Sequence, residues 1–66
     1  MAAFSVFFCD QESCNIQPVR AMDPDHAIAQ VRQQVPDLRR VAVVADEFLE
    51  GLDPQQLLRE WIQARI

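Results

Sequence analysis

The chain contains no lysine, threonine or tyrosine, and only one of its 66 residues is glycine. Without lysine it offers neither a Schiff-base amine nor the lysine with which a P-loop grips phosphate. A single glycine, Gly51, can build neither a glycine-rich phosphate loop nor a dinucleotide-binding fingerprint. These absences exclude the familiar nucleotide-binding motifs.

Positive charge is also scarce, because six arginines face ten acidic residues and the net charge is −4. Nucleic-acid-binding domains usually show a basic face, whereas here the candidates reduce to Arg20, Arg39 and Arg40. An acidic balance keeps a small protein in solution and disfavours phosphate backbones and anionic membranes. We therefore expect nucleic acid to be an improbable partner.

The N-terminal stretch is apolar but has no basic segment before it, and Asp10 and Glu12 interrupt it early. It is too short for a signal peptide or a membrane span. The sequence therefore predicts a cytoplasmic protein with no membrane partner.

Residues 2–9 form the most aromatic run and read as a central β-strand. Phe4, Val6 and Phe8 alternate onto one face, because strand side chains have a period of two. Phe7 places a large ring on the opposite face, so both faces of this strand need cover.

Two further strands are predicted. The polar residues 10–13 have no Asn-Gly or Asp-Gly and favour a hairpin loop longer than a tight two-residue turn. Residues 15–22 follow as a strand in which Pro18 cannot donate to a ladder, which is typical of an edge. Residues 39–45 are almost continuously apolar and β-branched, which indicates a strand buried on both faces.

Two Asp-Pro pairs predict the starts of two helices. Asp23 and Asp53 suit the N-cap, and a proline suits the first helical position. The first helix ends before Pro36. Residues 46–52 fit a loop, a helical turn or an extension of the third strand, and the sequence does not choose among these. The apolar stripes of the two helices are Ala27, Ile28, Val31 and Val35 in the first, and Leu57, Leu58, Trp61 and Ile62 in the second.

Together these elements predict one small α+β domain spanning residues 1–66, with the order ββαβα. A strand–helix–strand connection is usually parallel and right-handed, so the third strand should run parallel to the second. We therefore expect a three-stranded sheet of order 2-1-3, with the third strand antiparallel to the first. Each helix has one apolar stripe, and we expect both helices on one face of the sheet.

The residues that could carry chemistry are few. Cys9 and Cys14 flank the hairpin loop and are interpreted as two reduced thiols of a cytosolic protein, with a geometrically possible cross-strand disulfide as the alternative. A zinc site needs about four ligands, and His26 is the only histidine. His26 itself is interpreted as a solvated residue at a helix start.

A second candidate is the acidic stretch that follows the third strand. It matches no calcium loop and is interpreted as a solvated segment; its members are Asp46, Glu47, Glu50 and Asp53. We expect no metal, no cofactor and no enzymatic activity, because no pair of titratable groups is placed for catalysis.

The predicted interaction surface is the sheet face away from the helices. With both helices on the other face, Phe7, Ala42 and Val44 would stay uncovered beside Arg40, and an uncovered apolar patch usually marks an interface. In the other register the uncovered residues would be Phe4 and Phe8 with Val41 and Val43. The edge of the third strand also lacks proline and lysine. Trp61 is read as core against the sheet, with an exposed anchor for a partner as the alternative.

The leading hypothesis is a non-enzymatic protein-interaction or regulatory module, such as a phage- or operon-encoded modulator. It would form a homodimer through the open face or the third-strand edge, since a core of this size is marginal: ordering costs about 1.5 kcal/mol per residue. One alternative is a nucleic-acid-associated accessory protein that uses Arg20, Arg39 and Arg40. Another is a thiol or metal protein that uses Cys9 and Cys14.

Overall fold

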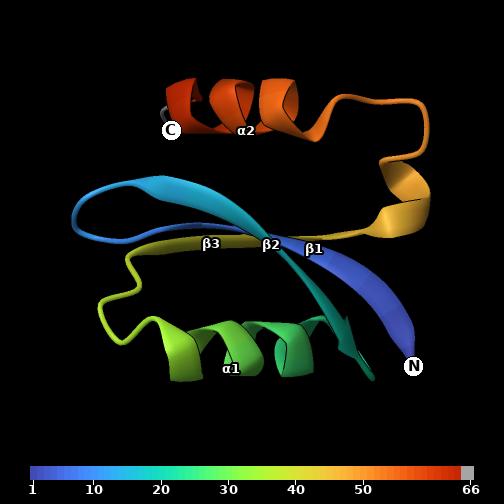
Figure 1. Ribbon diagram of the computed structural model, residues 1–66, viewed down its shortest axis with the longest axis horizontal. Helices are drawn as coiled ribbons and strands as arrows, with labels where there is room; N and C mark the ends of the chain where they lie inside the picture. The colour runs from blue at the N-terminus through green and yellow to red at the C-terminus, as the bar shows by residue number, and fades with distance from the viewer. Residues whose placement is uncertain (65–66) are drawn as a thin grey trace.

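The computed structural model describes residues 1–64 and confirms the α+β class and the ββαβα order (Figure 1). The elements are β1 (Ala2–Cys9), β2 (Cys14–Ala21), α1 (Pro24–Gln34), β3 (Arg40–Ala45), the short 3-10 helix η1 (Asp46–Phe48) and α2 (Pro54–Gln63). The strands form one sheet in the order β2-β1-β3, and β1 is antiparallel to both neighbours. β3 therefore runs parallel to β2, as a strand–helix–strand connection requires.

The larger core lies between the sheet and α1. Phe4, Val6 and Phe8 point to this face of β1, as their alternation predicts, and all three are buried. They pack with Ala27 and Val31, which lie one helical turn apart on α1. Half-buried side chains from the end of α1, its connection and β3 complete this core: Val35, Leu38, Val41, Val43 and Ala45.

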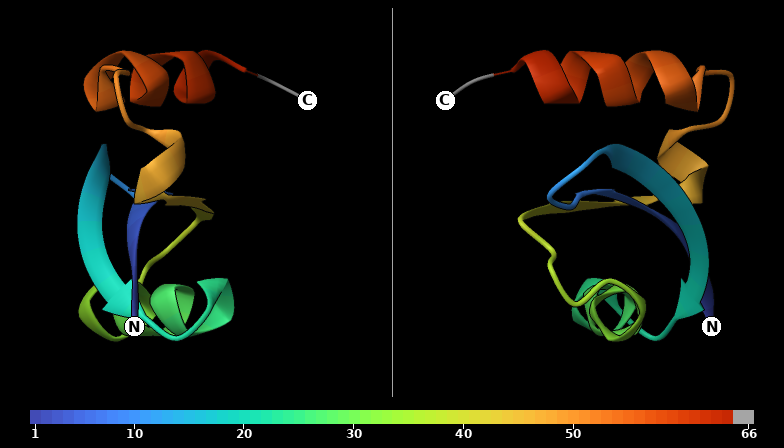
Figure 2. Two further views of the ribbon diagram at one scale, coloured as in Figure 1. Left: turned by 90° about the vertical axis from the view of Figure 1, so that its right-hand side faces the viewer. Right: turned by 60° about the vertical axis from the view of Figure 1, so that its left-hand side comes forward.

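The expectation that both helices share one face of the sheet is wrong. α1 and α2 lie on opposite sides of the sheet, which makes three layers (Figures 1 and 2). The physical reason is Phe7, whose ring points away from α1 and would stay wet if α2 joined α1 on the same face. Because each helix has a single apolar stripe, the two helices cover one apolar face of the sheet each.

Both helices begin where the Asp-Pro pairs predict. The Asp23 carboxylate accepts a hydrogen bond of 2.8 Å from the backbone N–H of His26, and the Asp53 carboxylate accepts one of 3.0 Å from that of Gln55. A proline follows each cap at the first helical position, where its missing N–H costs nothing. Local chemistry is enough to set these two boundaries.

The segment between β3 and α2 carries the chain from one side of the sheet to the other. It opens with η1, and the buried Ser5 hydroxyl donates a hydrogen bond of 2.7 Å to Asp46 Oδ1 at the start of that turn. Gly51 then has a φ of 78°, which is in the left-handed region that favours glycine. This path decides that α2 packs against Phe7.

Candidate interaction surface

The hairpin between β1 and β2 brings the two cysteines together. Cys9 and Cys14 are directly opposite each other in the β1–β2 register and form a disulfide. Residues 1–64 contain no free cysteine and no cluster of three or more side chains able to hold a metal ion. The interpretation of Cys9 and Cys14 as reduced thiols is therefore wrong, because their positions opposite each other bring the two sulfur atoms within bonding distance.

Asp10 organises the four-residue loop that links the cysteines. Its carboxylate accepts hydrogen bonds of 2.8 Å from the backbone N–H groups of both Ser13 and Glu12. These bonds favour the charged form and lower the pKa of Asp10, the bond from Ser13 contributing most. The loop is therefore held by an ionised side chain.

The sheet face that was expected to be open is covered by α2. Phe7 is only 3% exposed, and the Trp61 ring meets it edge-on, with the ring centroids 6.0 Å apart and an interplanar angle of 79°. Leu58, one helical turn before Trp61, is 7% exposed. Phe7 is therefore a core residue and cannot contact a partner, and Trp61 is part of its cover.

Arg40 belongs to the same covered face. Its guanidinium lies 4.6 Å from the centroid of the Trp61 ring, and its Nη2 donates a 3.4 Å hydrogen bond to the Trp61 carbonyl. A cation over an aromatic face is stabilising by roughly 0.5–1 kcal/mol at an exposed site. Arg40 thus fastens the end of α2 to the start of β3.

The three arginines proposed for nucleic acid do not form one patch. Arg20 is opposite Ala3 and Arg40 is opposite Cys9, so they lie near opposite ends of β1. At about 3.4 Å per residue the separation along the strand is roughly 20 Å. Arg39 lies beside Arg40 but its Nε is 3.7 Å from Asp37 Oδ1 in an exposed ion pair.

β3 forms one outer edge of the sheet, and its outward-facing backbone groups can be assigned from the ladder. The Cys9 carbonyl accepts a 2.9 Å hydrogen bond from the Arg39 N–H, so the backbone of Cys9 points toward β3. The Cα atoms of Cys9 and Cys14 are 4.0 Å apart, which fits a pair without mutual backbone hydrogen bonds. Both observations indicate that the backbone N–H and C=O groups of Cys9, and of every second residue before it in β1, point toward β3.

This alternation carries over to β3 through its register with β1. Residues opposite Cys9, Phe7 and Ser5 turn their N–H and C=O groups toward β1; they are Arg40, Ala42 and Val44. The residues between them turn these groups away from the sheet; they are Val41, Val43 and Ala45. The free edge of β3 therefore presents a row of backbone donors and acceptors.

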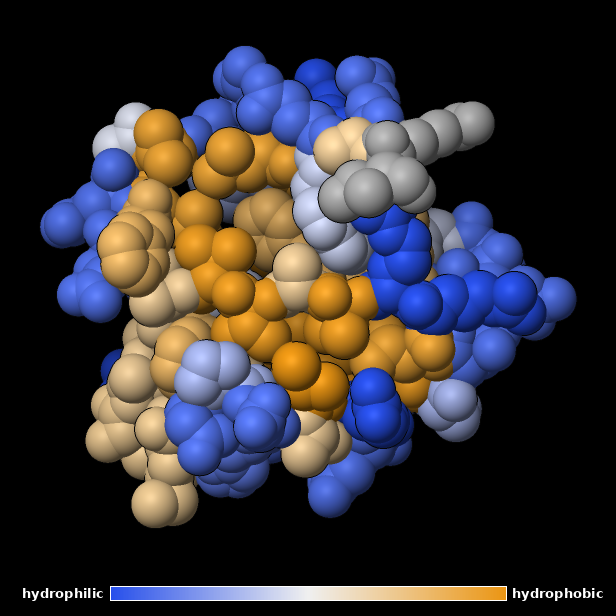
Figure 3. All heavy atoms as spheres, turned by 180° about the vertical axis from the view of Figure 1, so that it is seen from behind, coloured by the Kyte–Doolittle hydropathy of each residue, from blue (hydrophilic) through white to orange (hydrophobic). Residues whose placement is uncertain are grey.

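Apolar side chains accompany this row of backbone groups. Every residue from Val41 to Ala45 is only half-buried. Figure 3 shows the molecule from the side on which β3 lies, and hydrophobic side chains form a continuous band across it. We call the outward backbone groups and half-buried side chains of residues 41–45 the β3 edge.

The opposite edge of the sheet differs in its chemistry. Pro18 lies opposite Ser5, whose backbone faces β3, so the nitrogen of Pro18 points outward. An outward proline removes a donor from the edge of β2 and hinders the addition of another strand. The prediction that Pro18 marks an edge strand is confirmed, and β3 carries no comparable block.

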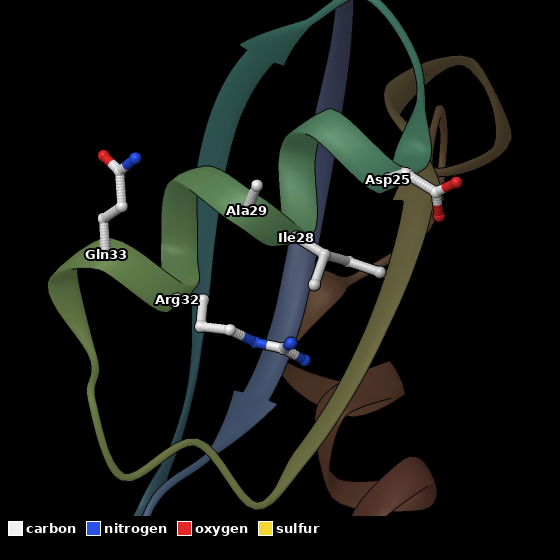
Figure 4. A pocket seen from close by; sticks show the side chains of 5 residues that line it. All are labelled: Asp25, Ile28, Ala29, Arg32 and Gln33. Carbon is white, nitrogen blue, oxygen red and sulfur yellow. The ribbon is translucent and has the colours of Figure 1, made fainter.

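A shallow groove on α1 lies beside the β3 edge. Gln30 donates a 2.8 Å hydrogen bond to the Arg20 carbonyl and Gln34 accepts one of 2.9 Å from Gln17, which ties one flank of α1 to β2. The other flank, with Ile28 and Arg32, therefore faces the β3 side. The groove spans this flank and the outer surface of the helix, and its lining residues are Asp25, Ile28, Ala29, Arg32 and Gln33. In Figure 4 the side chains of Ile28 and Arg32 project on one side of this helix and Gln33 on the other.

Sequence reasoning missed this flank because it assigned Ile28 to the apolar stripe that faces the sheet. The signal was present: Ile28 lies off the axis of Ala27 and Val31, between the oppositely charged Asp25 and Arg32. The direction of this flank is known only from the hydrogen bonds that tie the opposite flank of α1 to β2.

Comparisons of this chain with protein-family models, with curated proteins and with solved structures give no match. Its function must therefore be argued from its own residues. Among residues 1–64, neither helix has the length and apolar character needed to cross a membrane.

Proposed function

We propose that this chain is a small acidic, non-enzymatic protein-interaction module, with a regulatory role, that associates with a second copy of itself along the β3 edge. The carrying observation is that edge: a strand with outward N–H and C=O groups, half-buried apolar side chains and no blocking proline or lysine. Addition of a strand to such an edge is a common mode of protein recognition.

The burial of Phe7 excludes one of the two surfaces that the sequence offered for a homodimer. Association through the open sheet face needed Phe7, Ala42 and Val44 to be uncovered together, and α2 now lies over Phe7. Of the two routes to a homodimer, only the strand edge retains support. Ala42 and Val44 contribute to that edge, and Arg40 stands at its beginning.

The test is a proline placed where the native chain already uses one on β2. Val43→Pro removes an outward N–H from β3, while Arg20→Pro removes an outward N–H from β2 and keeps the Arg20 carbonyl that accepts from Gln30. By sedimentation equilibrium between about 10 µM and 1 mM, we expect the wild type and Arg20→Pro to approach twice the 7.6 kDa chain mass. Val43→Pro should remain at the mass of one chain.

Two results would refute the proposal: a wild type that stays monomeric over the whole range, or a Val43→Pro variant that associates as well as Arg20→Pro. Far-UV circular dichroism shows whether each variant is folded. If Val43→Pro unfolds, Ala42→Lys replaces it, since lysine on an edge strand also opposes pairing and removes no backbone donor.

The cytoplasmic location that the sequence predicts is not carried into this proposal. Thiols in most cytosolic proteins are kept reduced, and disulfides persist mainly in oxidising compartments. The Cys9–Cys14 disulfide therefore argues against a cytoplasmic location.

A further inference from the structure

We infer that two copies pair antiparallel through β3 about a two-fold axis at Val43, and that the charges at the two ends of the strand set this register. The inference rests on the proposed function and deepens it. Residues 39–47 read Arg-Arg-Val-Ala-Val-Val-Ala-Asp-Glu. Two positive residues precede the apolar run and two negative residues follow it, at equal distances from Val43.

Antiparallel pairing about Val43 places unlike charges opposite each other. Arg40 then faces the end of β3 in the second copy, where Asp46 opens η1, and Arg39 lies toward Glu47 in that same turn. A two-fold axis repeats both pairs at the other end of the interface, because the same surface is used twice. Parallel pairing would instead place like charges side by side, which is destabilising.

The directions of the backbone groups of β3 also favour a two-fold axis at Val43. Val43 is one of the residues whose N–H and C=O groups point outward, and so are Val41 and Ala45. With Val43 opposite its own copy, Val41 lies opposite Ala45, and every outward group from 41 to 45 has a partner. Moving the axis to Ala42 or Val44 leaves outward groups unpaired at one end and separates the charges from their counterparts.

The side chains are compatible with this pairing on both faces of the sheet. Ala42 meets Val44 of the second copy on the α2 side, and Val43 meets itself on the α1 side. These residues are half-buried in one chain, so pairing removes further apolar surface from water, a favourable change. No charged residue lies inside the run from 41 to 45.

The exposed flank of α1 repeats the arrangement of charges. Asp25 precedes Ile28 by three residues and Arg32 follows it by four, so the three share one side of the helix. The two-fold axis at Val43 turns this flank toward its copy, with Asp25 toward Arg32. This second antisymmetric set lies on the same side of the molecule as the first.

The experiment exchanges the charges in two variants. The first carries Arg39→Glu and Arg40→Glu, so both ends of its edge are acidic; the second carries Asp46→Arg and Glu47→Arg, so both ends are basic. At about 50 mM salt we expect the dimer dissociation constant of each variant alone to rise at least tenfold, because four favourable charge pairs become repulsive. An equimolar mixture should recover an affinity within about threefold of the wild type, since each acidic end then meets a basic end.

The outcomes separate this inference from the proposed function. Recovery in the mixture supports the register. If both variants dimerise like the wild type while Val43→Pro is monomeric, the edge association stands and the charge-set register about Val43 is overturned. If the wild type is monomeric, both proposals fail.

Arg40 also contacts Trp61 and Asp46 also accepts from Ser5, so the double variants are checked for folding by circular dichroism. Arg39→Glu and Glu47→Arg, made singly, leave those two contacts intact. Each single variant alone should raise the dissociation constant by about threefold or more, because it makes two charge pairs repulsive and not four, and mixing the two should reverse this loss. Absence of recovery in folded single variants would also overturn the register.

Discussion

Leu58→Ala tests whether α2 is the cover of the second sheet face. Leu58 is 7% exposed, whereas Leu52, just before the helix, is 53% exposed. Leu52→Ala therefore makes the same chemical change at a site that water already reaches. Comparing the two variants isolates burial from the intrinsic cost of replacing leucine.

The magnitude follows from the atoms removed. Leucine to alanine deletes three carbon atoms, each contributing about 0.8 kcal/mol when fully buried, or roughly 2.4 kcal/mol in all. The remaining cavity adds to this, although a helix on the surface can settle into it, so the total belongs near the lower end of the usual range of about 2–5 kcal/mol. For Leu52→Ala the same reasoning predicts a loss below about 1 kcal/mol.

Urea unfolding followed by fluorescence and circular dichroism measures both losses. Trp61 is the only tryptophan, and its ring contacts Phe7, so its emission should shift to longer wavelength when α2 leaves the sheet. A domain of this size rarely has more than about 3–5 kcal/mol to lose, and the Leu58→Ala midpoint should fall clearly. Equal losses for Leu58→Ala and Leu52→Ala would refute the assignment of α2 as the cover of Phe7.

Two further predictions concern the hairpin. Reducing the Cys9–Cys14 disulfide should lower the free energy of unfolding by about 2 kcal/mol, because even a short closed loop restricts the unfolded chain. Urea unfolding with and without reductant measures this loss. An unchanged midpoint, or an equal response to reductant in the control variant Cys9→Ser/Cys14→Ser, would contradict the prediction. The lowered pKa of Asp10 means that its contribution to stability is present above the unfolded value and is lost as pH falls through the folded one. An NMR titration should therefore find the Asp10 carboxyl below the value in an unstructured peptide, and Asp10→Asn should remove that acid-dependent loss.

The strands and the helix starts could be predicted because their causes are local. The alternation of Phe4, Val6 and Phe8 defines a strand within a few residues, and an Asp-Pro pair caps a helix by itself. Pro18 likewise identifies an edge without knowledge of its neighbours. In each case the residues that decide the structure lie within a few positions of one another in the sequence.

The placement of α2 could not be predicted on those terms. It depends on the path of residues 46–53, where the hydrogen bond from Ser5 to Asp46 and the left-handed Gly51 turn the chain. The one available signal was Phe7, a large ring on a face that had no other assigned cover. Giving weight to that ring would have placed Trp61 over it.

The candidate surface was predicted only in part. The apolar run and the missing proline identified the β3 edge, but the residues with outward backbone groups depend on the pairing of β1 with both neighbours. Disulfide formation was similarly open, because sequence spacing brings Cys9 and Cys14 close without deciding their oxidation. Both answers need the register, which is a property of the whole sheet.

The two edges of the sheet have opposite consequences for assembly. A three-stranded sheet with two free edges could add copies at both sides and grow without limit, since open head-to-tail contacts build filaments. Pro18 obstructs the β2 edge, so the proposed association uses the edge of β3. When β3 pairs with its own copy about a two-fold axis, the only available edge is used up and the assembly closes at two chains. The antisymmetric charges around Val43 favour that closed arrangement over parallel or shifted pairings.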